Sequence, residues 1–343
     1  MNDFKTELNQ FFESIESIPD KKKYWLIRTE GGEYFESFTN FNYVALGYDE
    51  ILYSKIFDLK KTAKNLEDFK VKLKAHIDTI LPDRAPGLIA SQLTKFIYEV
   101  NKGDLVIVPS ENSTYISIGE VTDSNLMEVT DLMVNRTDCP YRKRKSVRWI
   151  KTIDKKSTDL LLYRALQSHQ AITDVTKHAN IIERSIGDFY KLDDETNLII
   201  NVQRETNVPA PDLMFFGSDL LKFTRDFIEH YDLDFDISDI EIKINVNSKG
   251  KTQFLSKNGR LILLLGVIFV GTCGGGFKVK WEGFDLDLST DGIISKVIDY
   301  QNNYHDRKVV DEFLKARDTL EIANNKDLIR YLKQFSTNKD KPK

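Results

Sequence analysis

The most basic stretch of the chain combines cationic with aromatic side chains. Between Tyr141 and Trp149 lie Arg142, Lys143, Arg144, Lys145 and Arg148. Cationic groups can neutralise the phosphates of a nucleic acid, and aromatic rings can stack on its bases. Charged residues of this kind also occur along the edge of a sheet, where they discourage pairing with other chains. The run therefore indicates a nucleic-acid contact through Tyr141, Arg142, Arg144 and Arg148, with a charged sheet edge as the alternative.

A second pattern, in the other half of the chain, has the residue types of a metal-dependent nuclease. Asp212 follows a proline, and Glu241 and Lys243 lie in a stretch of alternating apolar residues that predicts a strand. Two carboxylates beside a lysine can hold a divalent cation at a scissile phosphate. A strongly amphipathic helix begins at Leu213, however, where such a site needs a strand. Catalytic residues stay unassigned, and Asp212, Glu241 and Lys243 are candidates only for this alternative.

Other metal and cofactor chemistry has no sequence signature here. The two cysteines, Cys139 and Cys273, lack the spacing of metal ligands and cannot form a disulfide framework. The five histidines are scattered and form no paired motif. Phosphate-binding and dinucleotide-binding glycine motifs are absent as well. We expect no metal site and no cofactor, with Mg²⁺ implied only by the nuclease alternative.

Composition bounds the class of protein. The 343 residues are 41% hydrophobic and 30% charged, which is typical of a globular protein and long enough for two domains. The net charge of −4 means that any nucleic-acid site must be a local patch. The polar N-terminus does not have the pattern of a secretory signal, so we expect a cytoplasmic protein.

Hydrophobic periodicity predicts an α+β protein with two domains. A helix over 1–19 precedes a first domain over 20–190, in which strand-like stretches alternate with two helical repeats. This order favours a small β-barrel with inserted helices. Residues 191–212 contain acidic and proline-rich segments and predict a linker, although 198–202 could form a short strand. A second α+β domain over 213–335 and a polar tail over 336–343 follow.

An uncharged segment, Leu261–Phe277, is the most unusual feature of the second domain. It has 13 residues before the Gly274–Gly276 cluster, which is short for a bilayer-spanning helix of about 20 residues. The flanking stretches, 239–246 and 277–288, alternate apolar with polar residues, and each therefore offers one face to be covered. We expect a buried helix over Leu261–Val270. Contact with a membrane and a homo-oligomer interface in this domain are the alternatives.

The order of features in residues 24–150 resembles a known family. Trp25-Leu26-Ile27-Arg28 is followed by Gly31-Gly32, Val44-Ala45-Leu46-Gly47-Tyr48, Gly103-Asp104-Leu105-Val106 and Ile118-Gly119-Glu120-Val121. The order ends with Tyr141-Arg142-Lys143-Arg144 and Val147-Arg148-Trp149. This order resembles the PUA-like, EVE-related domain at the N-terminus of Mrr-type and other modification-dependent restriction proteins. Tyr48 stands where that family commonly has tryptophan.

The resemblance implies a reader of nucleic acid that holds a flipped or single-stranded base, often a modified one, in an aromatic slot. A base removed from its stack can recover stacking energy against an aromatic ring. The candidate binding residues are Trp25, Arg28, Tyr48, Tyr141, Arg142, Arg144 and Arg148. Trp25 and Arg28 lie an odd number of positions apart and so point to opposite faces of a strand. Burial of Trp25 in the core is therefore an alternative to a place in the slot.

The sequence as a whole predicts a binding protein for DNA or RNA that reads modified or flipped bases, plausible in bacterial antiviral defence. A modification-dependent endonuclease with its catalytic residues in the second half is the first alternative. A defence effector that acts on membranes through the apolar segment is the second.

Overall fold

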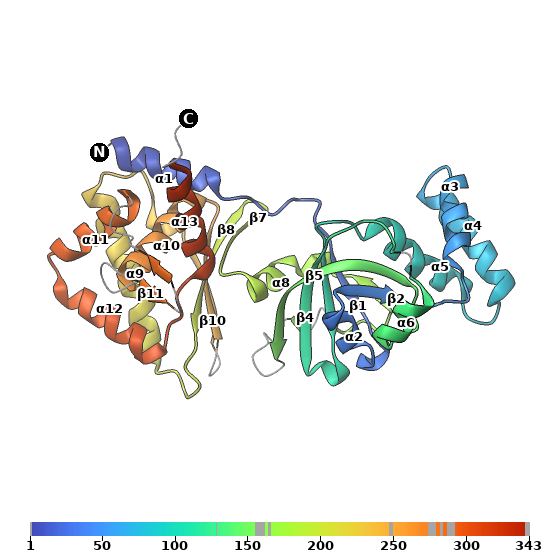
Figure 1. The fold of residues 1–343 in the computed structure, drawn as a ribbon. Coiled ribbons are helices and arrows are strands. Elements are labelled where there is room, and N and C mark those ends of the chain that lie inside the picture. Colours follow the sequence, from blue (N-terminus) through green and yellow to red (C-terminus); the bar gives the residue numbers. More distant parts are fainter. Residues whose placement is uncertain are drawn as a thin grey trace. The chain divides into compact units, whose positions relative to one another are not determined.

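The computed structural model describes residues 2–127, 129–154, 162–163, 166–246, 250–273, 279–281, 284–286 and 292–339 (Figure 1). Both helices and strands form, as the sequence predicts, and the chain divides into two compact units. One unit is residues 21–186, here called the sheet unit. The other combines residues 1–20 with 187–343, here called the helical unit.

A six-stranded sheet organises the sheet unit, with strand order β2-β5-β4-β3-β1-β6. The strands are β1 (Tyr24–Ile27), β2 (Tyr43–Leu46), β3 (Leu105–Pro109), β4 (Tyr115–Val121), β5 (Lys143–Asp154) and β6 (Ile172–Asp174). Neighbours pair antiparallel except β1 and β3, which are parallel. The sheet is curved, and β2 and β6 lie at its two ends, so the described strands form an open sheet rather than a closed barrel (Figure 1).

Strand alternation gives this sheet a core on each face. Trp25 and Ile27 contribute to one buried cluster, whereas Tyr24 and Leu26 contribute to another. Successive side chains of a strand point to opposite faces, so a four-residue apolar strand fits a position buried on both sides. All four residues of β1 are accordingly buried.

Helices fill the connections of the sheet unit. They are η1 (Glu30–Gly32), α2 (Phe35–Asn40), α3 (Tyr53–Thr62), α4 (Leu66–Ile80), α5 (Pro86–Thr94), η2 (Lys95–Glu99), η3 (Glu111–Ser113), α6 (Asp131–Thr137), η5 (Thr176–His178) and α8 (Ala179–Ile186). The helices α3, α4 and α5, which come between β2 and β3 in the chain, lie to one side of the sheet, and α4 packs against both α3 and α5 (Figure 1). Phe69, Leu73 and Ile77 of α4 are the buried face that the sequence spacing predicts.

A four-stranded antiparallel sheet with the order β7-β8-β10-β9 lies in the helical unit. Its strands are β7 (Phe189–Leu192), β8 (Glu195–Val202), β9 (Glu241–Val246) and β10 (Gly250–Ser256), and a separate pair is β11 (Val279–Trp281) and β12 (Phe284–Leu286). The helices are α1 (Asn2–Ser14), α9 (Ala210–His230), η6 (Ile237–Asp239), α10 (Gly259–Cys273), α11 (Gly292–Asn303), α12 (Arg307–Leu320) and α13 (Lys326–Lys339).

Two of the predicted domain boundaries need correction. The linker expected over 191–212 instead contains β8, an interior strand of the four-stranded sheet. The acidic turn at Asp193–Glu195 joins β7 to β8 as a hairpin, and a turn of that composition resembles a linker in sequence. The helix expected over 1–19 does not stand apart, because Phe4, Leu8 and Phe11 belong to the core of the helical unit.

The apolar segment forms the helix that the sequence predicts. Residues Leu261 to Val270 of α10 are buried, and they pack with α1, α9, α11 and β8 in one core. A uniformly apolar helix suits this central position because every side of it meets another element. The Gly274–Gly276 cluster, expected to end this helix, lies outside the described residues.

Candidate nucleic-acid interface

The basic run lies in the interior of the sheet unit instead of along an edge. Its strand, β5, pairs with β2 on one side and β4 on the other. Lys143 and Arg144 are each 1% exposed and Lys145 is fully buried. The sequence interpretation of the run as an exposed cationic patch is therefore wrong for these three residues, and so is the alternative of a charged edge.

Arg144 is held by the fold through Nε and Nη2 of its guanidinium group. It donates to the carbonyl oxygens of Tyr141 (2.7 Å) and Cys139 (2.8 Å) and to the hydroxyl of Thr137 (2.9 Å). Its Cζ lies 4.2 Å from the centroid of the Tyr43 ring. A planar donor with several fixed acceptors anchors the loop before β5, and it is not available to a phosphate.

The two buried lysines also have internal partners. Lys143 Nζ lies 3.0 Å from Asp49 Oδ1. Lys145 Nζ donates to the carbonyl oxygens of Val100 and Ser124, both at 2.6 Å. Burial lowers the pKa of Lys143, and burial together with the nearby Lys60 lowers the pKa of Lys145 to about 8. Both lysines therefore belong to the framework of the sheet unit.

The outer cations of the run are more exposed, and each has an acidic partner. Arg142 pairs with Asp131 and donates to the Val129 carbonyl. Arg148 Nη2 lies 2.8 Å from Glu120 Oε2. Exposed pairs of this kind are weak and can exchange partners with an incoming phosphate. Arg142 and Arg148 therefore stay as candidate contacts, whereas Arg144 does not.

Trp25 and Arg28 are also structural. Trp25 is fully buried, and its indole N–H donates to Asp104 Oδ2 at 3.0 Å. Arg28 donates to the carbonyl oxygens of Leu166 and Ser168 and fixes the segment before β6. Burial lowers the pKa of Arg28. The core position that the sequence allowed for Trp25 is the observed one, so Trp25 is not exposed to a ligand, whereas Arg28 is half-buried and uses Nε and Nη2 within the fold.

Three tyrosines gather where β1, β2 and β5 meet their loops. Tyr34 precedes α2, Tyr48 follows β2, and Tyr141 precedes β5. The rings of Tyr34 and Tyr141 meet edge to face, with centroids 5.1 Å apart. The antiparallel register pairs Leu46 with Lys143, which places the residues after β2 opposite the residues before β5. We call Tyr34, Tyr48 and Tyr141 the tyrosine cluster; all three are half-buried.

Glu30 is the common neighbour of this cluster. Its carboxylate accepts a hydrogen bond from the Tyr141 hydroxyl. Burial first, and then the Glu33 and Glu30 carboxylates, raise the pKa of Tyr34 to about 12. Burial raises the pKa of Tyr141 further, and the Glu30 carboxylate contributes to this rise and to that of Tyr48. The hydroxyls therefore stay protonated near neutral pH, and two of them donate within the fold: Tyr141 to Glu30, and Tyr48 to Gln92 Oε1 at 3.2 Å.

The backbone around the cluster is strained. Tyr48 has φ 65° and Glu30 has φ 50°, both in the left-handed region that side chains rarely adopt. Such conformations cost about 1–3 kcal/mol each and often occur at functional sites. Gly47 allows the close approach of a ring, because a Cβ there would lie 3.0 Å from Tyr141 Cε1. The combination of strain and close packing indicates that the cluster is held in one geometry.

The sequence identified two members of this cluster and missed the others. Tyr48 and Tyr141 are candidate residues that the structure brings together through Gly47 and Glu30. Tyr34 and Glu30 flank the Gly31-Gly32 turn, whose glycines were the one signal for them in the sequence. Gly32 must be glycine here, since its φ is 112° and a Cβ would lie 2.1 Å from the Glu111 nitrogen.

The nuclease candidates lie on elements that differ from the expected ones. Asp212 is in the first turn of α9, and Glu241 and Lys243 lie on β9 at the edge of the four-stranded sheet. No group of three or more His, Cys, Asp or Glu side chains within the described residues is arranged to hold a metal ion. The nuclease pattern needs Asp212 on a strand, but Asp212 lies on a helix.

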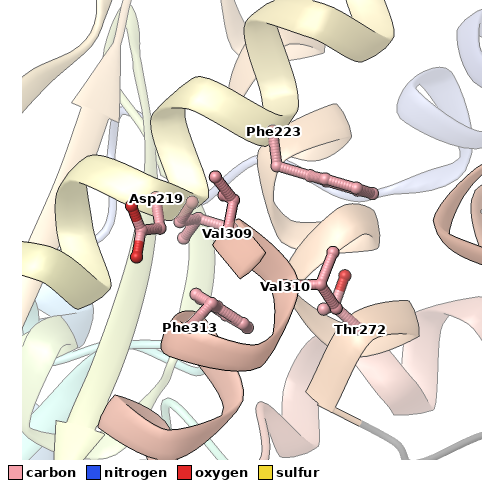
Figure 2. A pocket seen from close by; sticks show the side chains of 7 residues that line it. Asp219, Phe223, Thr272, Val309, Val310 and Phe313 are labelled. Atoms are coloured by element: carbon pink, nitrogen blue, oxygen red, sulfur yellow. The ribbon is translucent and has the colours of Figure 1, made fainter. Parts of the chain in front are cut away.

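A small cavity lies among α9, α10 and α12 (Figure 2). It measures about 10 Å³, room for roughly one water molecule. Its lining is apolar apart from Asp219 and Thr272, and Asp219 Oδ2 and Thr272 Oγ1 have no hydrogen-bond partner among the residues that the structure describes. Burial, and then the Glu312 carboxylate, raise the pKa of Asp219. The size of the cavity suits a structural water bridging polar atoms better than an organic ligand.

Comparisons with known proteins give one match. A model of the family described as "Domain of unknown function (DUF8426)" matches residues 23–176. The match lies within the sheet unit and includes the whole tyrosine cluster. No curated protein and no solved structure matches the chain. As for membranes, none of the helices in the described part of the chain has both the length and the apolar character to cross one.

Proposed function

We propose that the sheet unit binds nucleic acid and stacks an unpaired or flipped base against the tyrosine cluster. The observation that carries the proposal is the convergence of Tyr34, Tyr48 and Tyr141 around Glu30, with a strained backbone at Tyr48. Half-buried tyrosine rings offer both a stacking face and a hydroxyl for a base edge. The sheet unit also contains more Lys and Arg than Asp and Glu, whereas the rest of the chain has the opposite excess.

The resemblance of residues 24–150 to PUA-like, EVE-related domains supports the extension to modified bases. On that resemblance we propose a role in bacterial antiviral defence, in which the tyrosine cluster distinguishes a modified from a plain base. Stacking and hydrogen bonding need no cofactor. We propose that the helical unit has a function separate from base recognition. We also propose that it forms the interface of a homo-oligomer.

Binding of single-stranded oligodeoxynucleotides tests the base site. Tyr141→Ala and Tyr48→Ala should each weaken binding by about 1–3 kcal/mol, the typical contribution of one stacking partner. Tyr115→Ala is the matched control, because Tyr115 is exposed at the start of β4 and away from the cluster in sequence. Affinity is measured by fluorescence anisotropy, and circular dichroism establishes that each variant is folded.

Discrimination between modified and plain bases needs a separate measurement. Oligonucleotides that differ by one methylated base should bind the native chain with different affinities, and Tyr48→Ala should reduce that difference more than it reduces affinity. Equal weakening by all three tyrosine variants, Tyr115→Ala included, would count against the base site at the tyrosine cluster.

A further inference from the structure

Positive charge in the sheet unit concentrates on the helices between β2 and β3. The segment from α3 to α4 carries Lys55, Lys60, Lys61, Lys64, Lys70, Lys72 and Lys74, against Asp58, Glu67, Asp68 and Asp78. Asp68 is neutralised within the segment, because it lies 2.9 Å from Lys72 Nζ and accepts the backbone N–H of Lys64. The segment is therefore basic in a chain whose net charge is −4.

Two of these lysines share a face of α4 and have no acidic partner among the described residues. Lys70 and Lys74 are four positions apart, which places them on the same side of the helix about 6 Å apart along its axis. The adjacent side of α4 carries the buried Phe69, Leu73 and Ile77, since Lys70 and Lys74 each follow one of these residues by one position. Lys70, at the border of this buried face, is half-buried, and Lys74 is exposed.

This face continues to the tyrosine cluster through the start of α5. Lys74 Cε lies 3.8 Å from the position that a Cβ would take on Gly87. Arg84, three residues earlier, is 66% exposed and lies 3.5 Å from Glu50. Glu50 lies two residues after Tyr48, and the Tyr48 hydroxyl donates to Gln92 Oε1 of α5 at 3.2 Å, so both Arg84 and α5 contact the segment around Tyr48.

We propose that Lys70, Lys74 and Arg84 form a phosphate track that leads the backbone of a nucleic-acid strand to the tyrosine cluster. The inference rests on the proposed function, and it adds α4 and the start of α5 to Arg142 and Arg148 as candidate phosphate contacts. The burial of Lys143, Arg144 and Lys145 removes three of the five cations of the basic run, so a strand of phosphates needs further cations from elsewhere in the sheet unit. Two exposed cations, Lys74 and Arg84, and the half-buried Lys70 lead from a helix face to aromatic rings, which matches a strand of phosphates with one base stacked.

The test compares two triple variants of the full chain. Lys70→Gln/Lys74→Gln/Arg84→Gln removes the phosphate track. Lys102→Gln/Arg136→Gln/Lys177→Gln is the matched control, since it removes the same charge from other exposed positions of the sheet unit. The probes are a single-stranded oligodeoxynucleotide and an abasic oligomer of the same length. Binding is measured over a range of salt concentrations.

The track variant should bind both probes more weakly than the native chain, and its slope of log affinity against log salt should be shallower by about 2. The control variant should keep the native slope. The inference is overturned if the track variant keeps the salt-dependence slope of the native chain, or if the control variant loses as much affinity as the track variant. Either result leaves the base site standing. Binding of the native chain to neither probe, with binding to anionic lipid vesicles instead, overturns both proposals.

The abasic oligomer separates the two proposals. Tyr141→Ala should leave its affinity unchanged, because it offers no base to stack, and should weaken only the oligonucleotide that carries bases. If Tyr141→Ala has no effect on either probe while the track variant weakens both, the track stands and the base site is wrong.

Discussion

At the scale of single residues, the sequence does not show whether a charged side chain is buried or exposed. Arg142, Arg144 and Arg148 occupy even-numbered positions, yet Arg144 is buried with Nε and Nη2 hydrogen-bonded while the other two form exposed pairs. Strand alternation alone would place all three on one face, but the loop before β5 folds over Arg144 and supplies its acceptors. Such a contact depends on residues outside the strand and has no local sequence signal.

Arg144→Ala should therefore destabilise the sheet unit instead of acting on phosphate binding. The substitution leaves the carbonyls of Cys139 and Tyr141 without donors and creates a cavity beside Tyr43, a loss of about 3 kcal/mol. Arg148→Ala should change stability by less than about 0.5 kcal/mol, as expected for an exposed pair. Chemical denaturation of both variants measures the difference. Similar unfolding midpoints for the two would show that Arg144 does not anchor the loop.

Asp188 should make the stability of the helical unit depend on pH. Its carboxylate accepts the backbone N–H groups of Lys326 (3.0 Å) and Asp327 (2.9 Å) at the start of α13, and Asp327 accepts the N–H of Asp188 (2.8 Å). Arg330 pairs with Asp327 on the same helix. Burial, and then the Asp327 carboxylate, raise the pKa of Asp188 to about 7.

The sign of that dependence follows from proton binding. Because the folded-state pKa of Asp188 lies above its ordinary value of 3.8, the folded chain holds an extra proton between about pH 4 and about pH 7. The contribution of Asp188 to stability is therefore complete below about pH 4 and is lost as pH rises through about 7. Asp188→Asn should flatten the decline in unfolding free energy over this range. An unchanged decline in Asp188→Asn would assign the pH dependence to other groups.

At the scale of elements, periodicity predicts most of the fold because helices and strands bury one face each. The sequence identifies β1 to β5, α4, α9 and α10 within a few residues, and the burial of Leu261 to Val270 is confirmed. It does not show that β8 is an interior strand, since Asn197 and Asn201 interrupt its apolar pattern. Asn197 is nonetheless buried, and its side chain accepts a hydrogen bond from Gln253 at 2.6 Å across the sheet.

In the candidate site, Tyr48 and Tyr141 can be predicted from the sequence because they are aromatic residues next to loops. Glu30 cannot be predicted in this way, because only the turn at Gly31 brings its carboxylate to the tyrosine cluster.

Leu264→Asp should unfold the helical unit, because it places an unpaired charge in the centre of α10. Leu264 is fully buried in the core of this unit, and an unpaired buried charge there should cost more than about 4 kcal/mol. Arg260→Ala is the control on the same helix, because Arg260 is exposed and pairs with Glu13 at 3.3 Å. Thermal melting should show loss of one transition only for Leu264→Asp. Retention of both transitions would contradict the central position of α10.

At the scale of the whole molecule, the chain is not a simple succession of domains. Residues 1–20 precede the sheet unit in sequence but belong to the helical unit in structure. Phe4, Leu8, Phe11 and Ile15 of this segment lie in the same core as α9 and α10. Lys191 Nζ also donates to the carbonyl oxygen of Ile15 at 2.8 Å, and Lys191 accepts from the backbone N–H of Ile18. The helical unit therefore combines residues 1–20 with residues 187–343, and we expect its folding to need both segments.

Deletion of residues 1–20 should unfold the helical unit and spare the sheet unit. The deletion removes four large buried side chains, each contributing roughly 1.5–3 kcal/mol, and this total approaches or exceeds the stability of a typical domain. Calorimetry of residues 21–343 should show the transition of the sheet unit alone, and residues 21–186 should give the same transition as an isolated fragment. Adding a peptide of residues 1–20 should restore the second transition, because α1 can then pack again against α10, α11 and α13. The variant Lys5→Ala, which changes an exposed position of α1, should keep both transitions. If residues 21–343 unfold in two native-like transitions, α1 is dispensable and the helical unit is complete without its N-terminal segment.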